Sequence, residues 1–107
     1  MTNKAFPILT SSYSLGPVHL RNRAIIPGHS MVHGNSSGLV SNKYRTYLVE
    51  RAKGGVSMVG MESAPIHPNS GTWVGQIELW RDEIVETLSQ TATEVHDEGA
   101  KLSIILW

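Results

Sequence analysis

The sequence of 107 residues contains no cysteine, which excludes disulfide bonds and thiolate chemistry from this segment. It has no excess of charge of either sign, because nine basic residues balance nine acidic ones. Without a basic stripe, it lacks the electrostatic footprint of proteins that bind nucleic-acid phosphates. A cationic amphipathic segment typical of membrane-surface binding is also missing. We therefore expect neither a nucleic-acid partner nor a membrane partner.

Long apolar runs are absent as well. No stretch approaches about 18 consecutive apolar residues, and the N-terminal sequence MTNKAFPILTSS has no apolar run long enough for a signal peptide. Together with the lack of cysteine, this pattern predicts a cytoplasmic protein. The chain has about the length of one domain, and its composition, 40% hydrophobic and 17% charged, predicts a globular rather than a disordered chain.

The sequence does contain short apolar segments that alternate with amphipathic ones. Residues 8–23 predict a hairpin that turns at Gly16 and Pro17. The segments after it predict, in order, a strand, a helix, a strand, a helix and a strand, at residues 24–27, 42–53, 56–61, 82–98 and 101–107. The continuous apolar run at residues 24–27 has the pattern of a strand covered on both faces, and the two later strands are predicted to be buried. This alternation is typical of right-handed βαβ units and predicts an α/β fold with a parallel sheet.

Local signals mark the ends of the first helix. Ser41 is a predicted N-cap, and Gly54 and Gly55 end the helix. Its stripe of Tyr44, Tyr47, Leu48 and Ala52 is interpreted as ordinary helix packing. Three strands and two helices leave an edge of a parallel sheet bare, whereas a complete (β/α)8 barrel needs about 250 residues. We therefore expect the first part of a larger fold.

Three stretches carry a resemblance to a known family: LGPVHLRNRAIIPGHS, YLVERAKGGVSMVGMESAPIHPNS and LWRDEIVETLSQTATEVHDEGAKLSIILW. In their order and spacing they resemble the N-terminal third of the Old Yellow Enzyme or NADH:flavin oxidoreductase family. The similarity is greatest to the branch with 2,4-dienoyl-CoA reductase and trimethylamine dehydrogenase, and it extends over residues 6–107. The resemblance implies that residues 1–107 are the N-terminal part of an FMN-binding TIM (β/α)8 barrel, incomplete here.

The implied function is that of an FMN-dependent oxidoreductase. Hydride would pass, through flavin N5, between reduced nicotinamide, NAD(P)H, and an enone, dienoyl-type or amine substrate. In this branch a further half often carries a 4Fe–4S cluster and a region that binds FAD or NAD(P)H. The family's catalytic residues lie outside residues 1–107, so we expect this segment alone to be inactive. The alternative is a non-catalytic truncated remnant or an interaction module.

The resemblance assigns the first cofactor-binding residues to the segment after the first buried strand. Pro27, Gly28, His29 and Ser30 lie where the family places backbone and a short polar side chain against the isoalloxazine ring. Gly28 has no Cβ, which permits the close approach of a flat ring. A Ser30 hydroxyl near the O4–N5 edge would stabilise negative charge on the reduced ring. The alternative is that Ser30 only caps a turn.

The two later strands supply the other candidates. Ser63 lies where the family has a small residue or a tyrosine near the flavin, and Glu62 coincides with a common acidic position. For Glu62, a functional role and a hydrogen bond that shapes the loop both remain open. Ile105 occupies the position of a glutamine or glutamate that contacts the pyrimidine edge. Its side chain donates no hydrogen bond, and losing one such bond weakens binding by about 1 kcal/mol.

The histidines allow two further hypotheses. His33 is a candidate for the mouth of the substrate site, with an ordinary exposed histidine as the alternative. A small metal-binding domain built on His29, His33 and His67 is the third class of function. It is disfavoured because Pro27 and Gly28 interrupt any helix there, and because no glutamate follows His29 as in H-E-x-x-H. We therefore predict no metal site.

Overall fold

The structure is a computed structural model that describes residues 5–34, 36–70 and 73–107. Its first element is the predicted hairpin, formed by β1 (Tyr13–Leu15) and β2 (Val18–Leu20), which pair antiparallel. The turn between them contains Gly16, whose positive φ of 57° suits a residue without a Cβ. The hairpin was therefore predicted correctly, with its turn at the expected position.

The main sheet is parallel, as the alternation of strands and helices predicts. Its three strands lie in the order β3 (Ile25–Ile26), β4 (Met58–Ala64) and β5 (Lys101–Leu106). Ile25 pairs with Met58 and Val59 pairs with Leu102, which places the strands in register at their amino ends. The register between β4 and β5 shifts between Gly60 and Ser63.

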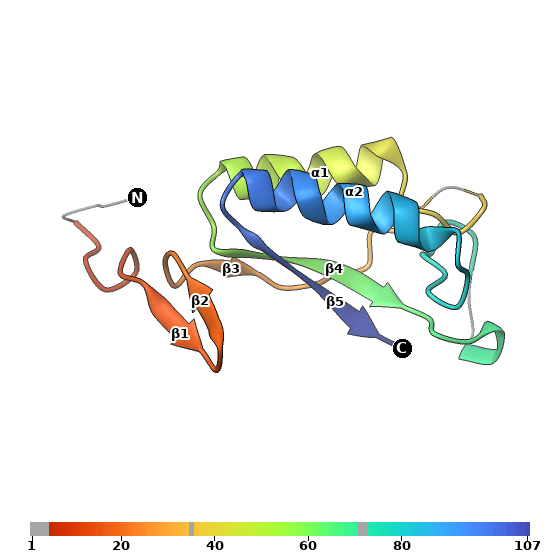
Figure 1. The fold of residues 1–107 in the computed structure, drawn as a ribbon, viewed down its shortest axis with the longest axis horizontal. Helices are drawn as coiled ribbons and strands as arrows, with labels where there is room; N and C mark the ends of the chain where they lie inside the picture. The colour runs from red at the N-terminus through yellow and green to blue at the C-terminus, as the bar shows by residue number, and fades with distance from the viewer. Residues whose placement is uncertain (1–4, 35, 71–72) are drawn as a thin grey trace.

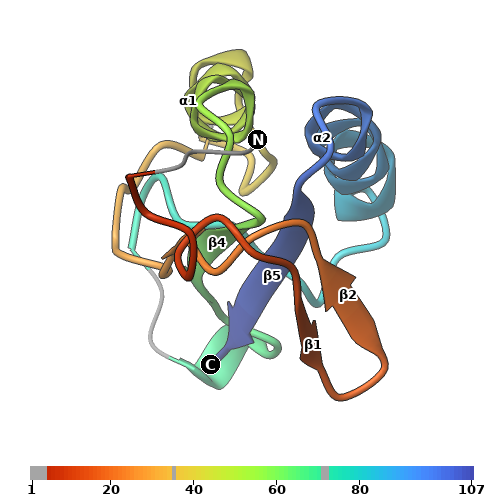
Figure 2. The ribbon, with the colours of Figure 1, turned by 90° about the vertical axis from the view of Figure 1, so that its left-hand side faces the viewer.

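Two helices cover one face of this sheet. Figures 1 and 2 show α1 (Asn42–Lys53) and α2 (Ile84–Asp97) side by side above β4 and β5, while no α-helix of the described residues covers the opposite face. A short 3-10 helix, η1 (Pro68–Ser70), follows β4. Among the described residues, no helix combines the length and the apolar character needed to cross a bilayer.

The ends of α1 follow the local signals of the sequence. The Ser41 side chain accepts a hydrogen bond from the backbone N–H of Tyr44, at 3.1 Å, as an N-cap does. At the other end, the backbone N–H of Gly54 donates to carbonyl groups of the last turn. Arg51 and Lys53 lie in this turn, where cations interact favourably with the helix dipole.

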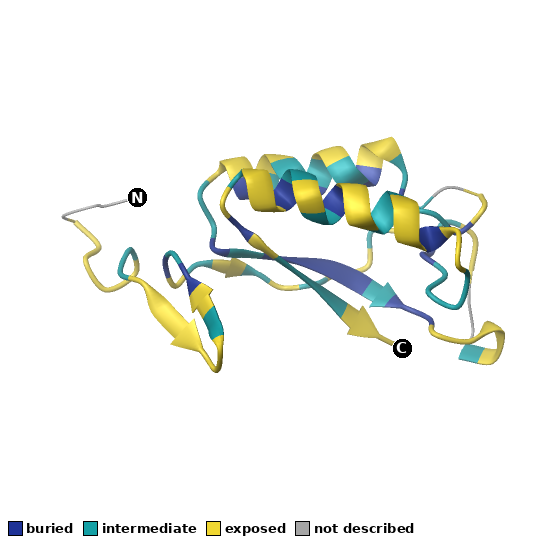
Figure 3. Ribbon diagram, viewed as in Figure 1, coloured by how far each residue is buried: buried dark blue, intermediate teal, exposed yellow. Residues whose placement is uncertain are grey.

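The core lies between the two helices and the sheet (Figure 3). Val59 and Met61 of β4 are completely buried, as are Leu48 and Ala52 of α1. The other members of the core come from the loops, from α1, from α2 and from the strands: Val40, Tyr44, Ala64, Ile77, Ile84, Val95 and Ala100. The predicted central strand is therefore confirmed as buried, and it is longer than predicted.

The predictions that β3 is covered on both faces and that β5 is buried are wrong. Ile25 of β3 is 51% exposed, and Ile105 and Leu106 of β5 are 47% and 64% exposed. The physical reason is that α1 and α2 cover only one face of the sheet (Figure 3) and that β3 and β5 are its two edge strands, each with a neighbouring strand of the described residues on one side only. A continuous apolar run identifies a strand whose two faces can both be buried. Whether they are buried depends on the helices and strands that pack against it.

Candidate functional site

The carboxyl ends of the parallel strands bring the predicted cofactor-binding residues together. Residues 27–30 follow β3 directly, and Ser63 and Ile105 lie near the ends of β4 and β5. Ser63 and Ile105 are paired in the β4–β5 register, so they are direct neighbours across the sheet. In Figure 1 both arrowheads point away from the N-terminal segment, toward this edge. Ligand sites of parallel α/β folds lie at such edges.

Gly28 is required by close packing of its backbone. A Cβ at this position would overlap the carbonyl oxygen of Met61 and would lie 2.9 Å from the Cδ1 atom of Ile105. A Cβ on Gly60 would in turn meet the backbone nitrogen of Gly28. The segment after β3 therefore lies directly on β4, and two glycines make this approach possible.

The His29 side chain contacts helix α1. Its Nε2 atom lies 3.2 Å from the hydroxyl oxygen of Tyr47, and the two rings meet edge to face with centroids 5.9 Å apart. The Arg51 guanidinium stacks on the Tyr47 ring, with its Cζ atom 3.4 Å from the ring centroid. Sequence reasoning assigned Tyr47 to ordinary packing and missed its polar contact. Ser30, the next residue, is exposed.

Glu62 lies beneath the same loop. Its side chain is buried, and its Oε2 atom accepts hydrogen bonds from the backbone N–H groups of Met31 and Val32, both at 2.9 Å. The backbone N–H of Glu62 donates to the hydroxyl of Tyr44 at 2.8 Å. Burial raises the pKa of Tyr44 well above its usual range, against the opposing effect of this N–H donor. Of the two open interpretations of Glu62, the hydrogen bond that shapes the loop is present.

A second buried polar side chain lies near Ser63. The Nε2 atom of Gln76 donates to the Ser63 carbonyl at 3.1 Å. The Oε1 atoms of Gln76 and Glu62 are both buried and have no hydrogen-bond partner among the described residues. No motif in the sequence singled out Gln76, because its contact depends on how the long segment after β4 folds back.

The remaining histidines have separate surroundings. The ring of His33 lies edge to face with Tyr44, with centroids 6.5 Å apart, and its carbonyl accepts a hydrogen bond from the Ser41 hydroxyl. His67 is exposed, and its Nδ1 atom accepts the backbone N–H of Asn69 at 3.1 Å. Within the described part of the chain, no three histidine or acidic side chains are grouped so that they could hold a metal ion.

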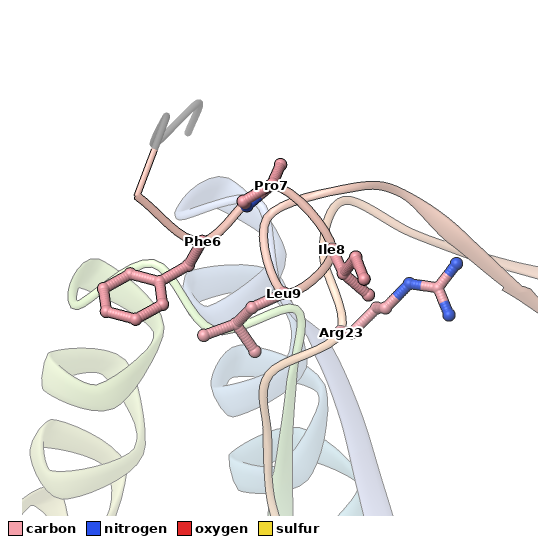
Figure 4. Close-up of a pocket in the computed structure, with 5 residues that line it drawn as sticks. All are labelled: Phe6, Pro7, Ile8, Leu9 and Arg23. Atoms are coloured by element: carbon pink, nitrogen blue, oxygen red, sulfur yellow. The ribbon is translucent and has the colours of Figure 1, made fainter.

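An apolar hollow of the surface lies at the other end of the sheet. It has a volume of about 490 Å³ and is lined by Phe6, Pro7, Ile8, Leu9 and Arg23. Figure 4 shows the guanidinium of Arg23 extending away from Phe6 and Leu9, so the lining is apolar. Since Arg23 precedes β3, this hollow is at the amino ends of the strands and is separate from the polar groups described above.

Comparison with protein families gives a match to the NADH:flavin oxidoreductase / NADH oxidase family over residues 11–107. The chain belongs to this family. The match includes both helices and all three strands of the parallel sheet, together with every predicted cofactor-binding residue. The resemblance inferred from the three sequence stretches is thereby confirmed.

Two curated relatives are similar along nearly the whole chain. A probable N-methylproline demethylase of Rhizobium meliloti is 36% identical over 99 residues, which is 92% of this chain and 14% of the relative. The N,N-dimethylglycine/sarcosine dehydrogenase of Chromohalobacter salexigens is 29% identical over 94% of this chain and 15% of its own length. The chain therefore spans only a small part of the length of these relatives.

Solved structures confirm the fold. Old Yellow Enzyme from Pichia sp. AKU4542 superimposes with a TM-score of 0.87 at 23% identity, over 94% of this chain and 26% of that enzyme. A 2-naphthoyl-CoA reductase gives a TM-score of 0.88 at 24% identity and covers 94% of this chain and 16% of that protein. The three parallel strands and two helices are thus part of a TIM barrel, as predicted.

Proposed function

We propose that this chain forms one side of the FMN site of an FMN-dependent oxidoreductase. The observation that carries the proposal is the convergence of residues 27–30, Ser63 and Ile105 on the carboxyl edge of the parallel sheet, in a chain of the NADH:flavin oxidoreductase family. Active sites of TIM barrels are built at this edge. The apolar hollow at the amino edge offers no comparable set of polar groups.

The residues present fit a flavin. The backbone of residues 27–30 is fixed against β4, because neither Gly28 nor Gly60 has room for a Cβ. Pro27, His29 and Ser30 remain exposed beside it, so a flat ring has access to this backbone. When bound, FMN would supply a two-electron acceptor and donor. The Ser30 hydroxyl would donate a hydrogen bond to the ring, while Ile105 would give only apolar contact at its edge.

The proposed substrate is an N-methylated amine. Both curated relatives carry names of enzymes that demethylate or dehydrogenate such amines. In this reaction the N-methyl carbon would give up a hydride to the two-electron acceptor that FMN would supply, water would add to the resulting iminium carbon, and formaldehyde and the demethylated amine would be released. NAD(P)H with an enone or dienoyl-type substrate is the alternative from the same family. A 4Fe–4S cluster and an FAD-binding or NAD(P)H-binding region elsewhere in the protein remain predictions.

The test uses the natural gene product that carries this chain, purified and supplied with FMN. Under anaerobic conditions we expect sarcosine or N-methylproline to bleach the visible flavin band, whereas glycine and proline, which lack the methyl group, leave it unchanged. Bleaching by NADH alone would support enone reduction instead of amine oxidation. A protein that retains no FMN after gel filtration would contradict the proposed function.

A further inference from the structure

The loop between β3 and α1 is attached to β4 through a side chain. Glu62 projects from β4, is 1% exposed, and directs a single carboxylate oxygen at two consecutive backbone N–H groups, those of Met31 and Val32. Hydrogen bonds from backbone N–H to a charged acceptor are about twice as strong as neutral ones. Two such bonds therefore anchor the loop to the sheet at one point.

The conformation of this loop requires support. Val32 has a φ of 52°, the only positive value at a described residue other than glycine, and a β-branched side chain disfavours this region. The carbonyl of Val32 packs on Gly75, where a Cβ would approach its oxygen to 2.7 Å, and the backbone N–H of Gly34 donates to the Gly75 carbonyl at 2.6 Å. Such conformations persist only where the surroundings hold them.

Glu62 also fixes the residues that precede its hydrogen-bond donors. Gly28 is seated on Met61, and Met31 is held by Glu62, so two consecutive residues of β4 hold both ends of the segment that contains His29 and Ser30. The position of the Ser30 hydroxyl depends directly on the peptide group that follows it, which is the one whose N–H binds Glu62.

We propose that Glu62 is a positioning residue of the flavin site: its carboxylate holds the backbone of Met31 and Val32 and thereby places Ser30 against the flavin. The inference rests on the proposed function, and it goes beyond it by assigning a role to a buried residue that acts only through the loop. Glu62 is not a catalytic residue in this account, because the loop lies over it and it is almost completely inaccessible.

Three substitutions separate anchoring from mere filling of space. Glu62→Gln keeps an oxygen at the same distance, so it can still accept both N–H groups. Glu62→Asp keeps the charge but is shorter by one methylene, and Glu62→Ala removes the acceptor. Glu94→Gln is the matched control, because this carboxylate is partly exposed on α2 and pairs with Arg45 at 3.3 Å. All variants are made in the natural gene product.

The first measurement is the FMN dissociation constant, obtained from the recovery of flavin fluorescence, together with the visible circular dichroism of the bound flavin. We expect Glu62→Ala and Glu62→Asp to weaken binding about tenfold, the equivalent of one to two lost hydrogen bonds, and to alter the dichroic band. Glu62→Gln should recover most of the affinity. Wild-type affinity and spectrum in folded Glu62→Ala or Glu62→Asp would overturn the proposal.

The second measurement is hydrogen exchange at the amides of Met31 and Val32, which needs no flavin. Exchange should be slow in the wild type, in Glu62→Gln and in Glu94→Gln, and fast in Glu62→Asp and Glu62→Ala. Equal protection in all variants would contradict the anchoring role, whatever the flavin does. If the amides respond as expected but the wild type binds no FMN, the proposed function fails while the loop anchor stands. If Glu62→Ala does not fold, Glu62→Asp against Glu62→Gln decides.

Discussion

At the amino ends of the strands, polar side chains of the segment before β3 bind the backbone of the neighbouring turns. Arg21 donates to the carbonyls of Ala52, Val56 and Glu98 at 2.8–3.2 Å, and Asn22 donates to the carbonyl of Gly55 at 2.7 Å. One guanidinium thus links the C-terminal ends of both helices to the start of β4.

At the carboxyl ends, the polar groups are less completely satisfied. Glu62 and Gln76 each keep one buried oxygen without a partner among the described residues, and Val32 has a positive φ. His29 and Ser30 are exposed. Unsatisfied groups and unusual backbone conformations concentrate at functional sites. The difference between the two ends is the one expected if the amino end stabilises the fold and the carboxyl end holds the proposed flavin site.

The largest expected effect is a loss of stability caused by a substitution at the amino ends of the strands. Arg21→Ala in the natural gene product should lower the free energy of unfolding by about 3 kcal/mol, because several carbonyls lose a charged donor. FMN affinity of the folded protein should stay unchanged. Denaturant unfolding and flavin titration measure the two quantities. Arg45→Ala, which removes one ion pair with Glu94 and one hydrogen bond to the Asn42 side chain, should cost less, about 1 kcal/mol; equal losses for the two variants would contradict the comparison.

Gly28→Ala should disturb the carboxyl end by steric overlap with the Met61 carbonyl. We expect a loss of about 2 kcal/mol in stability and, unlike for Arg21→Ala, weaker FMN binding. Gly54→Ala is the milder control, since its φ of −64° suits alanine and the Arg51 carbonyl oxygen, 3.2 Å from the added Cβ, needs to move by only a few tenths of an ångström. Unchanged FMN binding in Gly28→Ala would separate this loop from the flavin site.

Ile105→Gln should strengthen the carboxyl end as a binding site. A glutamine there offers an amide to the edge of the flavin, so FMN binding should tighten about fivefold, the equivalent of about 1 kcal/mol. Stability should change little, because the side chain of Ile105 is nearly half exposed. Leu106→Gln is the control, since Leu106 pairs with Ala64 one position further along β5. The same change in affinity for both variants would argue against a contact specific to Ile105.

The last effect, which is modest at neutral pH, concerns the pH dependence of stability. Burial raises the pKa of Tyr44 in the folded protein above the ordinary value of 10.0, so the unfolded chain releases this proton first as the pH rises. The contribution of Tyr44 to the free energy of unfolding is therefore intact below pH 10.0. Above this pH it declines by at most about 1.4 kcal/mol per pH unit. Tyr44→Phe should be about 1 kcal/mol less stable at neutral pH but decline less steeply in alkali. Parallel declines for both proteins would contradict this assignment.

Local signals of the sequence were sufficient to place the hairpin turn and both ends of α1. The N-cap at Ser41, the glycines after Lys53 and the turn at Gly16 each act within a few residues, and all three lie where predicted. Burial of β3 and β5 was not predictable in this way, because it depends on helices that cover only one face. The parallel order of the sheet followed from the alternation of elements.

The site was predictable only in part. The resemblance located residues 27–30, Ser63 and Ile105, and the parallel sheet brings them to one edge. The hydrogen bonds of Arg21 join residues up to 77 positions apart in the sequence, and no sequence periodicity predicts them. Glu62 gave the clearest available signal, since a carboxylate inside an apolar strand needs a partner. Its actual partners, two backbone N–H groups 30 and 31 residues earlier, became evident only from the structure.

The most direct test of the account is the midpoint potential of FMN bound to the natural gene product, measured for the wild type, Ser30→Ala and Ser89→Ala. Ser89 lies exposed on α2 and serves as the matched control. If the carboxyl edge holds the flavin, Ser30→Ala lowers the potential, because a donor to the reduced ring is lost, and Ser89→Ala leaves it at the wild-type value. Equal potentials for all three proteins, or a wild type that binds no FMN, would contradict the assignment of the site.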